Sequence, residues 1–450
     1  MTEQPASTLR PQLFDTACEW VAEIDPFKRR GLVKRVTGIV IEAVCPPVFI
    51  GELCYLINDR LAEPLPCEVI GVRGHSALLM PFDFSSDISV GTEVRTTGRT
   101  FSIPLSPAYL GRVVDGLGRP LDGKGPLPRG KLYPVNQPAP SPLSRPTISQ
   151  KIPSGIKAID AFLTWGKGQR LGVMAGSGVG KSTLFGMIAR HAEADINVIG
   201  LIGERGREVN EFIERDLGEE GLKRSVVIAV PSNESPLLRV KGAQITFTVA
   251  EYFRDRGDDV LLLMDSLTRY AYALREIGLT LGEPPTTRGY TPSVYAQIPR
   301  LCERAGLCDV GSITALLTIL VEGDDMNEPV ADIARSVLDG HIVLSRKLLT
   351  EGQLPPVDIL DSISRVMPEV VEDTQIELAQ WVRNVMSTYY DAEDLINIGA
   401  YQVGTNAKID QAIRCIGHLR EFLRQGINEK VEYSQALEQL RTLVAEQRKV

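Results

Sequence analysis

The chain has 450 residues, of which 43% are hydrophobic and 24% are charged, and its formal net charge is −8. This composition is typical of a globular protein, and the length predicts roughly two or three domains. The acidic balance argues against nucleic acid as the main ligand. The cysteines form no C-x-x-C pair, which disfavours a zinc site or a disulfide framework. Because no secretory leader or long apolar run is visible, we expect a cytoplasmic protein that reaches membranes only peripherally, through partners.

The first predicted element is a short helix over residues 12–25. Its apolar residues recur at helical spacing and would form one face: Leu13, Phe14, Ala17, Trp20, Val21 and Ile24. Two interpretations stay open. The helix either packs on its own domain or docks another protein, such as a regulator.

Residues 31–99 are predicted to form a small β-barrel. Short β-rich runs at 31–43, 68–72, 76–80 and 92–95 are separated by proline and glycine, as in all-β modules with frequent turns. No catalytic constellation is visible there, so we expect the barrel to serve assembly. The Pro- and Gly-rich segment 104–155 lacks periodicity and is predicted to be an extended connector.

From residue 159 to about 345, apolar strands alternate with helical segments. The predicted strands are 171–174, 197–202, 225–230, 260–264 and 312–320. Such runs fit a parallel sheet covered on both faces, which binds ligands at the carboxyl ends of its strands. After residue 368 helical periodicity takes over. We therefore divide the chain into 1–100 (N-terminal helix and barrel), 101–367 (core of alternating strands and helices) and 368–450 (helical domain).

A glycine-rich loop after the first of these strands is the strongest local motif. The loop and the start of its helix comprise Gly176, Ser177, Gly178, Val179, Gly180, Lys181, Ser182 and Thr183. A strand, a glycine loop and a helix N-terminus in this order can wrap backbone N–H groups around a polyphosphate. Lys181 would reach the β- and γ-phosphates and the Ser182 hydroxyl would bind Mg²⁺. The usual first glycine of the motif is Ala175 here, a small residue that still fits a tight turn.

Charged residues that follow two other strands are candidates for binding Mg²⁺ and for aligning the attacking water. Asp265 ends the strand 260–264 and could hold Mg²⁺. Glu204 ends the strand 197–202 and could align the attacking water, with Arg205 holding the carboxylate or a phosphate. Glu208 is a further candidate metal ligand in the same charged cluster. Each signal is weak alone and gains weight from the phosphate loop.

Arginines are candidates for stabilising charge on the transferred phosphoryl group. Arg269 follows Asp265 by four residues, one helical turn, and could face the same phosphates. An arginine from a neighbouring subunit could reach the γ-phosphate, and Arg335, Arg346 and Arg365 are candidates among which spacing alone does not choose.

Several motifs together resemble the rotary ATPase superfamily and, within it, the ATPases of flagellar and type III protein export. The motifs are GSGVGKST at 176–183, GERGRE at 203–208, LMDSLTRY at 263–270, GEPPTTRGYTPSV at 282–294, EGDDMNEPV at 322–330, LDGHIVLSR at 338–346 and INIGAYQVG at 396–404. The resemblance implies an α/β fold: a RecA-like P-loop core with a small N-terminal β-barrel and a helical C-terminal domain, assembled as a homohexamer.

The resemblance also implies roles for single residues. Glu204 corresponds to the carboxylate that activates water, and Arg205 and Arg269 correspond to arginines near the phosphates. Arg365, in SISR at 362–365, corresponds to the arginine supplied across the subunit interface. Where related subunits stack an aromatic residue on adenine this chain has Leu354, and Tyr401 is expected to cover another side of the base.

The same resemblance implies binding partners and a cellular function. ATP and Mg²⁺ are the expected substrate and cofactor. The loop 276–291 is expected to face a coiled-coil stalk protein in the ring centre, and a regulator or stator is expected at the N-terminus. Hydrolysis would release and unfold chaperone-bound export substrates at a membrane export gate. The overall sequence favours flagellar over virulence-type export.

Three other interpretations are weighed against this one. The export-type segments 282–294 and 396–404 argue against the catalytic subunit of a proton-translocating ATP synthase. The acidic charge, and a barrel without an aromatic, basic platform, argue against a hexameric helicase or terminator acting on RNA. The presence of Lys181, Ser182, Glu204, Asp265 and Arg365 argues against a ring subunit that only binds nucleotide.

Overall fold

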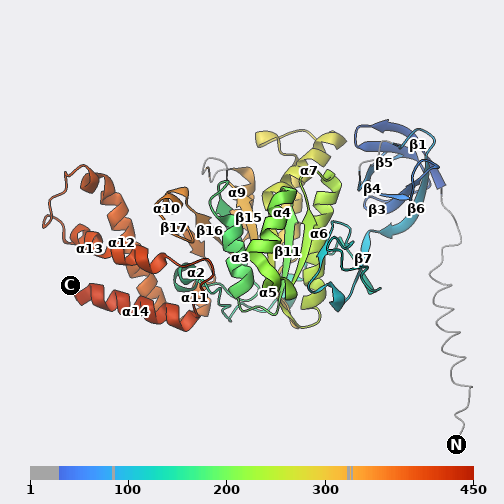
Figure 1. Cartoon of the computed structure of the whole chain (residues 1–450). Helices are drawn as coiled ribbons and strands as arrows, with labels where there is room; N and C mark the ends of the chain where they lie inside the picture. The colour runs from blue at the N-terminus through green and yellow to red at the C-terminus, as the bar shows by residue number, and fades with distance from the viewer. Residues whose placement is uncertain (1–29, 84–86, 322–324, 326–327, 450) are drawn as a thin grey trace, which may run out of the picture. The chain divides into compact units, whose positions relative to one another are not determined.

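The computed structural model describes residues 30–449 apart from 84–86, 322–324 and 326–327 (Figure 1). The predicted helix over residues 12–25 lies outside these described residues. The chain divides into two compact units, one ending at Phe101 and one running from Ser102 onward.

The first unit is a closed barrel, which confirms the predicted small barrel. Its strands are β1 (Arg30–Thr37), β2 (Val40–Val44), β3 (Glu52–Ile57), β4 (Leu65–Arg73), β5 (Ser76–Pro81) and β6 (Glu93–Thr100), in the order β1-β2-β5-β4-β3-β6. Alternate residues such as Val33, Leu56 and Leu79 point inward and form its core. The predicted run 31–43 is two strands, because the chain turns at Gly38 with a φ of +59°.

A mostly parallel sheet forms the centre of the second unit. The strands at the predicted positions are β10 (Arg170–Ala175), β11 (Ile196–Ile202), β12 (Ser225–Val230), β13 (Asp259–Asp265) and β15 (Ser312–Leu320). The sheet order is β17-β16-β10-β15-β13-β11-β12-β8, with β14 (Gly306–Leu307) paired to β15. The strands β16 (Gly340–Leu344) and β17 (Val357–Ser364) were not predicted, and β17 runs antiparallel to β16. Because β10 lies inside the sheet, its carboxyl end is flanked by the ends of β15 and β16.

The segment 104–155 is more than the predicted connector. Its strand β9 (Lys131–Pro134) pairs with β7 (Ser102–Leu105), and β8 (Val113–Val114) adds an edge to the central sheet beside β12. These strands are only two to four residues long, too short to produce a periodic pattern.

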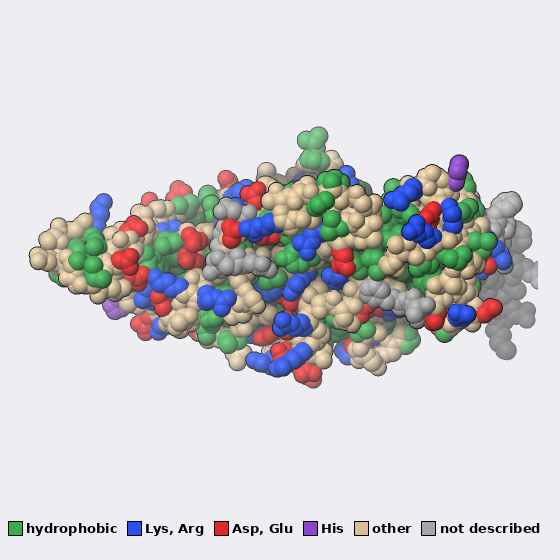
Figure 2. All heavy atoms as spheres, turned by 90° about the horizontal axis from the view of Figure 1, so that it is seen from above, with side chains coloured by type: hydrophobic (Ala, Val, Ile, Leu, Met, Phe, Trp, Pro, Cys, Tyr) green, Lys and Arg blue, Asp and Glu red, His purple; other side chains and the backbone are tan. Residues whose placement is uncertain are grey.

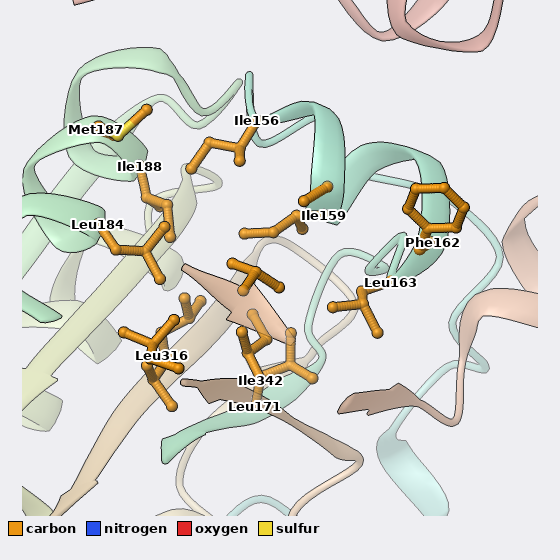
Figure 3. Close-up of a cluster of buried hydrophobic side chains, with 14 of the residues drawn as sticks. Ile156, Ile159, Phe162, Leu163, Leu171, Leu184, Met187, Ile188, Leu316 and Ile342 are labelled. Carbon is orange, nitrogen blue, oxygen red and sulfur yellow. The ribbon is translucent and has the colours of Figure 1, made fainter. Parts of the chain in front are cut away.

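Helices cover both faces of the sheet, and Figure 1 shows α3, α4, α6 and α7 packed around the strands. The helices of this core are α2 (Lys157–Phe162), α3 (Lys181–His191), α4 (Gly206–Glu211), α5 (Gly218–Lys223), α6 (Pro236–Arg254), α7 (Leu267–Leu281), α8 (Pro292–Cys302), α9 (Pro329–Val337), α10 (Arg346–Thr350) and α11 (Met367–Val370). In Figure 3, Leu184 of α3 and Ile159 of α2 point toward a cluster that includes Leu316. This buried apolar cluster fixes the start of α3, and therefore the phosphate loop, against the sheet.

The C-terminal part is helical, as predicted. It consists of α12 (Asp373–Asn397), α13 (Ala407–Leu423) and α14 (Tyr433–Lys449). The ring of Phe422 packs edge-on against Phe162 of α2, with the centroids 6.1 Å apart. Among the residues that the structure describes, no helix combines the length and the apolar character that a bilayer crossing requires. On the face in Figure 2, basic and acidic side chains are intermixed and form no continuous basic stripe.

Candidate functional site

The phosphate loop joins β10 to α3. Gly178 and Gly180 have φ angles of +74° and +93°, which L-residues with a Cβ rarely adopt. Gly180 immediately precedes α3, and no side chain caps the first N–H groups of that helix. These N–H groups, together with the positive end of the helix dipole, are available to an anion.

A cavity of about 840 Å³ opens at this loop. The predicted residues that line it are Gly176, Ser177, Gly178, Gly180, Lys181, Ser182, Thr183, Glu204, Arg205, Glu208 and Arg269. The phosphate loop, the charged residues that follow β11 and the arginine Arg269 come from three different parts of the sequence. They meet because the parallel strands β10, β11 and β13 end at the same edge of the sheet.

Lys181 stands at the centre of this edge. Its Nζ lies 2.5 Å from Asp265 Oδ1 and 3.6 Å from Glu204 Oε1. Desolvation works against the charge of this buried ammonium, but the two carboxylates outweigh it and raise the pKa of Lys181. Lys181 therefore remains a fixed positive charge at the mouth of the loop.

Glu204 has the properties of a proton acceptor at neutral pH. Burial raises its pKa to about 7, and Asp265 adds to this rise while Lys181 and Arg269 oppose it. Its Oε1 is buried and, among the described residues, has no hydrogen-bond partner. An oxygen beside the phosphate loop that forms ion pairs at 3.6 and 3.9 Å but accepts no hydrogen bond from any residue that the structure describes is suited to orient a water molecule.

The arginines of the cavity differ in how firmly they are held. Arg269 Nε lies 3.9 Å from Glu204 Oε1, on the first turn of α7. Arg205 Nη1 donates to Glu208 Oε1 at 3.1 Å, and both side chains are exposed. Arg205 and Glu208 therefore lie at the solvent side of the cavity.

Five predicted residues do not line the cavity: Val179, Asp265, Leu354, Arg365 and Tyr401. Val179 is fully buried in the core, so only its backbone remains for a ligand. Leu354 is 37% exposed and Pro356, two residues on, lies 4.0 Å from where a Cβ of Gly180 would be, which puts this segment beside the phosphate loop. Arg365 directly follows β17, and its Nη2 donates to the carbonyl of Arg335.

Tyr401 is the predicted residue that this chain does not bring to the phosphate loop. It lies between α12 and α13, where its hydroxyl donates to Asp410 Oδ1 at 2.9 Å. The turn between the two helices fixes that position. The hydroxyl closes this turn, and the expectation that Tyr401 covers another side of the base stays a prediction.

The sequence left Arg346 undecided and missed Thr318, as well as Tyr272, Leu320 and Val321 in the lining of the cavity. Arg346 lines its own chain's cavity and donates from Nη2 to the carbonyl of Ser177 at 2.7 Å. Thr318 Oγ1 donates to Asp265 Oδ1 at 2.7 Å from the middle of an apolar strand. A buried hydroxyl needs a hydrogen-bond partner. A threonine within an apolar strand was therefore the one sequence signal for the contact between Thr318 and Asp265.

The oxygen donors suit Mg²⁺ held together with a phosphate. Ser182 lines the cavity and offers a hydroxyl, and Asp265 offers a carboxylate 2.5 Å from Lys181 Nζ. Over residues 30–449, where described, no cluster of three or more His, Cys, Asp or Glu side chains could hold a metal alone. A site that needs phosphate oxygens to complete its coordination is the usual arrangement for Mg²⁺.

Family models match three successive parts of the chain. Residues 33–98 match the β-barrel domain and residues 155–364 the nucleotide-binding domain of the ATP synthase alpha/beta family. Residues 371–442 match the T3SS EscN ATPase C-terminal domain.

Whole-chain relatives extend these matches. The chain is 50% identical to the flagellum-specific ATP synthase of Bacillus subtilis, over 93% of this chain and 96% of the relative. It is 46% identical to the type 3 secretion system ATPase of Sinorhizobium fredii, over 92% of each.

Solved structures also match the fold. The structure of the assembled ATPase EscN from the type III secretion system of enteropathogenic E. coli has a TM-score of 0.87 at 41% identity, covering 92% of this chain and 100% of that one. EscN in complex with its central stalk EscO has a TM-score of 0.85 at 41% identity, with the same coverage.

Proposed function

The chain belongs to the ATP synthase alpha/beta family, in the branch of flagellum-specific and type III secretion ATPases, and on that premise we propose how its site works. It is an ATP hydrolase that energises protein export of the flagellar or type III kind. The observation that carries the mechanism is the convergence of Lys181, at the start of α3, and Glu204, just after β11, beside the glycine loop at the carboxyl edge of the sheet.

The phosphate loop binds the polyphosphate of ATP through its backbone N–H groups, and Lys181 neutralises the β- and γ-phosphates. Glu204 accepts a hydrogen bond from the attacking water and aligns it with the γ-phosphorus. Arg269 forms a second ion pair with this carboxylate, since its Nε lies 3.9 Å from the same oxygen that faces Lys181. Arg346, bound to the carbonyl of Ser177, holds the loop in shape.

Ser182 and Asp265 would hold Mg²⁺ together with phosphate oxygens. The bound ion supplies positive charge that offsets the charge on the β- and γ-oxygens. Thr318 keeps Asp265 in place for this role, since its hydroxyl occupies one carboxylate oxygen.

The site is completed by a second copy of the chain. Arg365 lies outside its own chain's cavity and is the arginine that a neighbouring subunit would insert beside the γ-phosphate. We propose a homohexameric ring of this chain. Leu354 contributes the surface on which the base rests. We propose the division 1–100, 101–367 and 368–450, in which the first part serves assembly and the second carries out hydrolysis.

Partners follow from the same assignment. EscN has been solved with a central stalk, EscO, and we propose a coiled-coil stalk protein of this kind in the centre of the ring, against 276–291. We further propose a regulator or stator at the N-terminus and chaperone-bound cargo delivered at a membrane export gate. The protein then works in the cytoplasm and is peripheral to the membrane through these partners.

The test is Mg²⁺-dependent phosphate release from ATP by the purified chain, measured together with its mass in solution. Lys181→Ala should abolish release while the oligomer still forms. An active Lys181→Ala protein would overturn the proposed site. Loss of flagellar or type III secretion in cells that carry only this variant would tie hydrolysis to export.

A further inference from the structure

Gln425 is a buried glutamine, 4% exposed, in the loop between α13 and α14. Its Oε1 accepts from the backbone N–H of Lys157 at 2.8 Å. Its Nε2 donates to the carbonyls of Gly155 and Glu429, both at 2.8 Å. Both N–H groups and the oxygen of its amide are therefore hydrogen-bonded. Gln425 belongs to no part of the phosphate site described above.

The side chain of Gln425 is hydrogen-bonded to a turn just before α2, and that turn is itself held in place. Both Ser154 and Gly155 donate their backbone N–H groups to the buried carboxylate of Asp160, at 2.8 and 3.0 Å. Gly155 has a φ of +76° and lies so close to His191 that a Cβ would stand 2.6 Å from that residue's Cβ. Hydrogen bonds and close packing therefore leave this turn little freedom to move.

The backbone of the same loop holds a different segment. The N–H of Gln425 donates to the carbonyl of Leu354 at 2.7 Å, and Arg424 Nη2 donates to the carbonyl of Glu351 at 3.2 Å. The segment 351–356 runs beside the phosphate loop, because Pro356 lies 4.0 Å from where a Cβ of Gly180 would be. Leu354 itself keeps 37% of its surface exposed.

We infer that Gln425 is a positioning residue for ATP: it ties the base-side segment around Leu354 to the fixed turn at Gly155. This inference rests on the proposed function and on Leu354 as the surface for the base. A segment that is already held in its binding position has less conformational entropy to lose when the nucleotide binds. Gln425 acts through Leu354 and does not touch the phosphates, so it affects binding of the base and not the chemistry.

Gln425→Ala removes the three side-chain bonds and leaves its backbone N–H in place. We expect the KM for ATP to rise roughly tenfold, because only part of the free energy of the three lost hydrogen bonds acts on the base-side segment. The kcat should change little, because binding of the base is equal in the ground and transition states. The inhibition constant of tripolyphosphate, which has no base, should stay at its wild-type value.

Three further variants make the test sharper. Gln425→Glu keeps the acceptor for Lys157 but has no N–H for Gly155 or Glu429, so it should behave like the alanine variant. Arg424→Ala, at an exposed position, should raise the KM in the same direction by less. Gln380→Ala, at an exposed position of α12, should have no effect.

The KM for ATP and the inhibition constant of tripolyphosphate, taken together, decide whether the inference holds. If Gln425→Ala weakened ATP and tripolyphosphate equally, the residue would serve only the stability of the site and the inference would be wrong. An unchanged KM for ATP would also overturn it. If tripolyphosphate failed to compete with ATP on the wild-type protein, the proposed phosphate site itself would be wrong, and the inference would fall with it.

Discussion

Thr318 and Asp265 are joined across adjacent parallel strands by a hydrogen bond of 2.7 Å to the same carboxylate oxygen that Lys181 binds. We expect Thr318→Val, which keeps the shape and removes the hydroxyl, to raise the Mg²⁺ concentration for half-maximal activity roughly fivefold, as about 1 kcal/mol would. Phosphate release in a Mg²⁺ titration measures this. Thr314→Val, in the same strand but bonded to Gly168, should leave the Mg²⁺ requirement unchanged. Equal shifts in the two variants would contradict the role of Thr318.

Glu204→Gln should separate binding from turnover. The amide keeps the size of the side chain but cannot take up a proton or align water as a carboxylate does, so kcat should fall by about 10²-fold or more. Equilibrium binding of a fluorescent ATP analogue should stay close to that of the wild type. A variant that hydrolyses ATP at the wild-type rate would remove Glu204 from the mechanism.

Activity should depend on pH through Glu204. Burial raises the pKa of this carboxyl to about 7, and it aligns water only when unprotonated. The kcat/KM should therefore rise by about tenfold per pH unit below that pKa and level off above it. Because the charge of Arg269 lowers the pKa of Glu204, Arg269→Gln should move the rising limb to higher pH. A profile that is flat across neutral pH, or a limb that moves to lower pH, would contradict this assignment.

Arg365→Ala should lower the turnover of the assembled ring by roughly 10³-fold, the range measured for arginines supplied from a neighbouring subunit. Its effect on nucleotide binding to the dilute single chain should be small. Activity measured against protein concentration, with the mass of the oligomer recorded at each point, tests the assignment. If the dilute single chain were as active as the ring, Arg365 would have no role across an interface.

The phosphate loop was predictable because its strand, glycines and helix follow one another without a break in the sequence. The strand-end positions of Glu204 and Asp265 were predictable for the same reason, since each directly follows an apolar run. The pattern alone could therefore predict that these residues gather at one edge of a parallel sheet.

Contacts that depend on register between distant strands were not predictable. Ala175 at the end of β10 pairs with Leu344 of β16, which brings Arg346 beside the phosphate loop of its own chain. Met264 pairs with Leu317, which sets Thr318 next to Asp265. Spacing along the chain carries no information on these pairings, so the sequence left Arg346 among several candidate arginines.

The remaining differences have local causes. The strands of the segment 104–155 are too short to show a period. The role of Gln425 was not visible in the sequence because its partners Gly155 and Leu354 lie 270 and 71 positions away.

The closed β-barrel has a mechanical consequence for any assembly built from this chain. Each strand from β1 to β6 has a partner on both sides, so the described residues of the barrel present no edge strand to a neighbour. A second copy can touch this module only through side chains and loops. Rings could then form and come apart without breaking strand pairing. The barrel of one copy would also not add to a sheet of another copy by strand pairing.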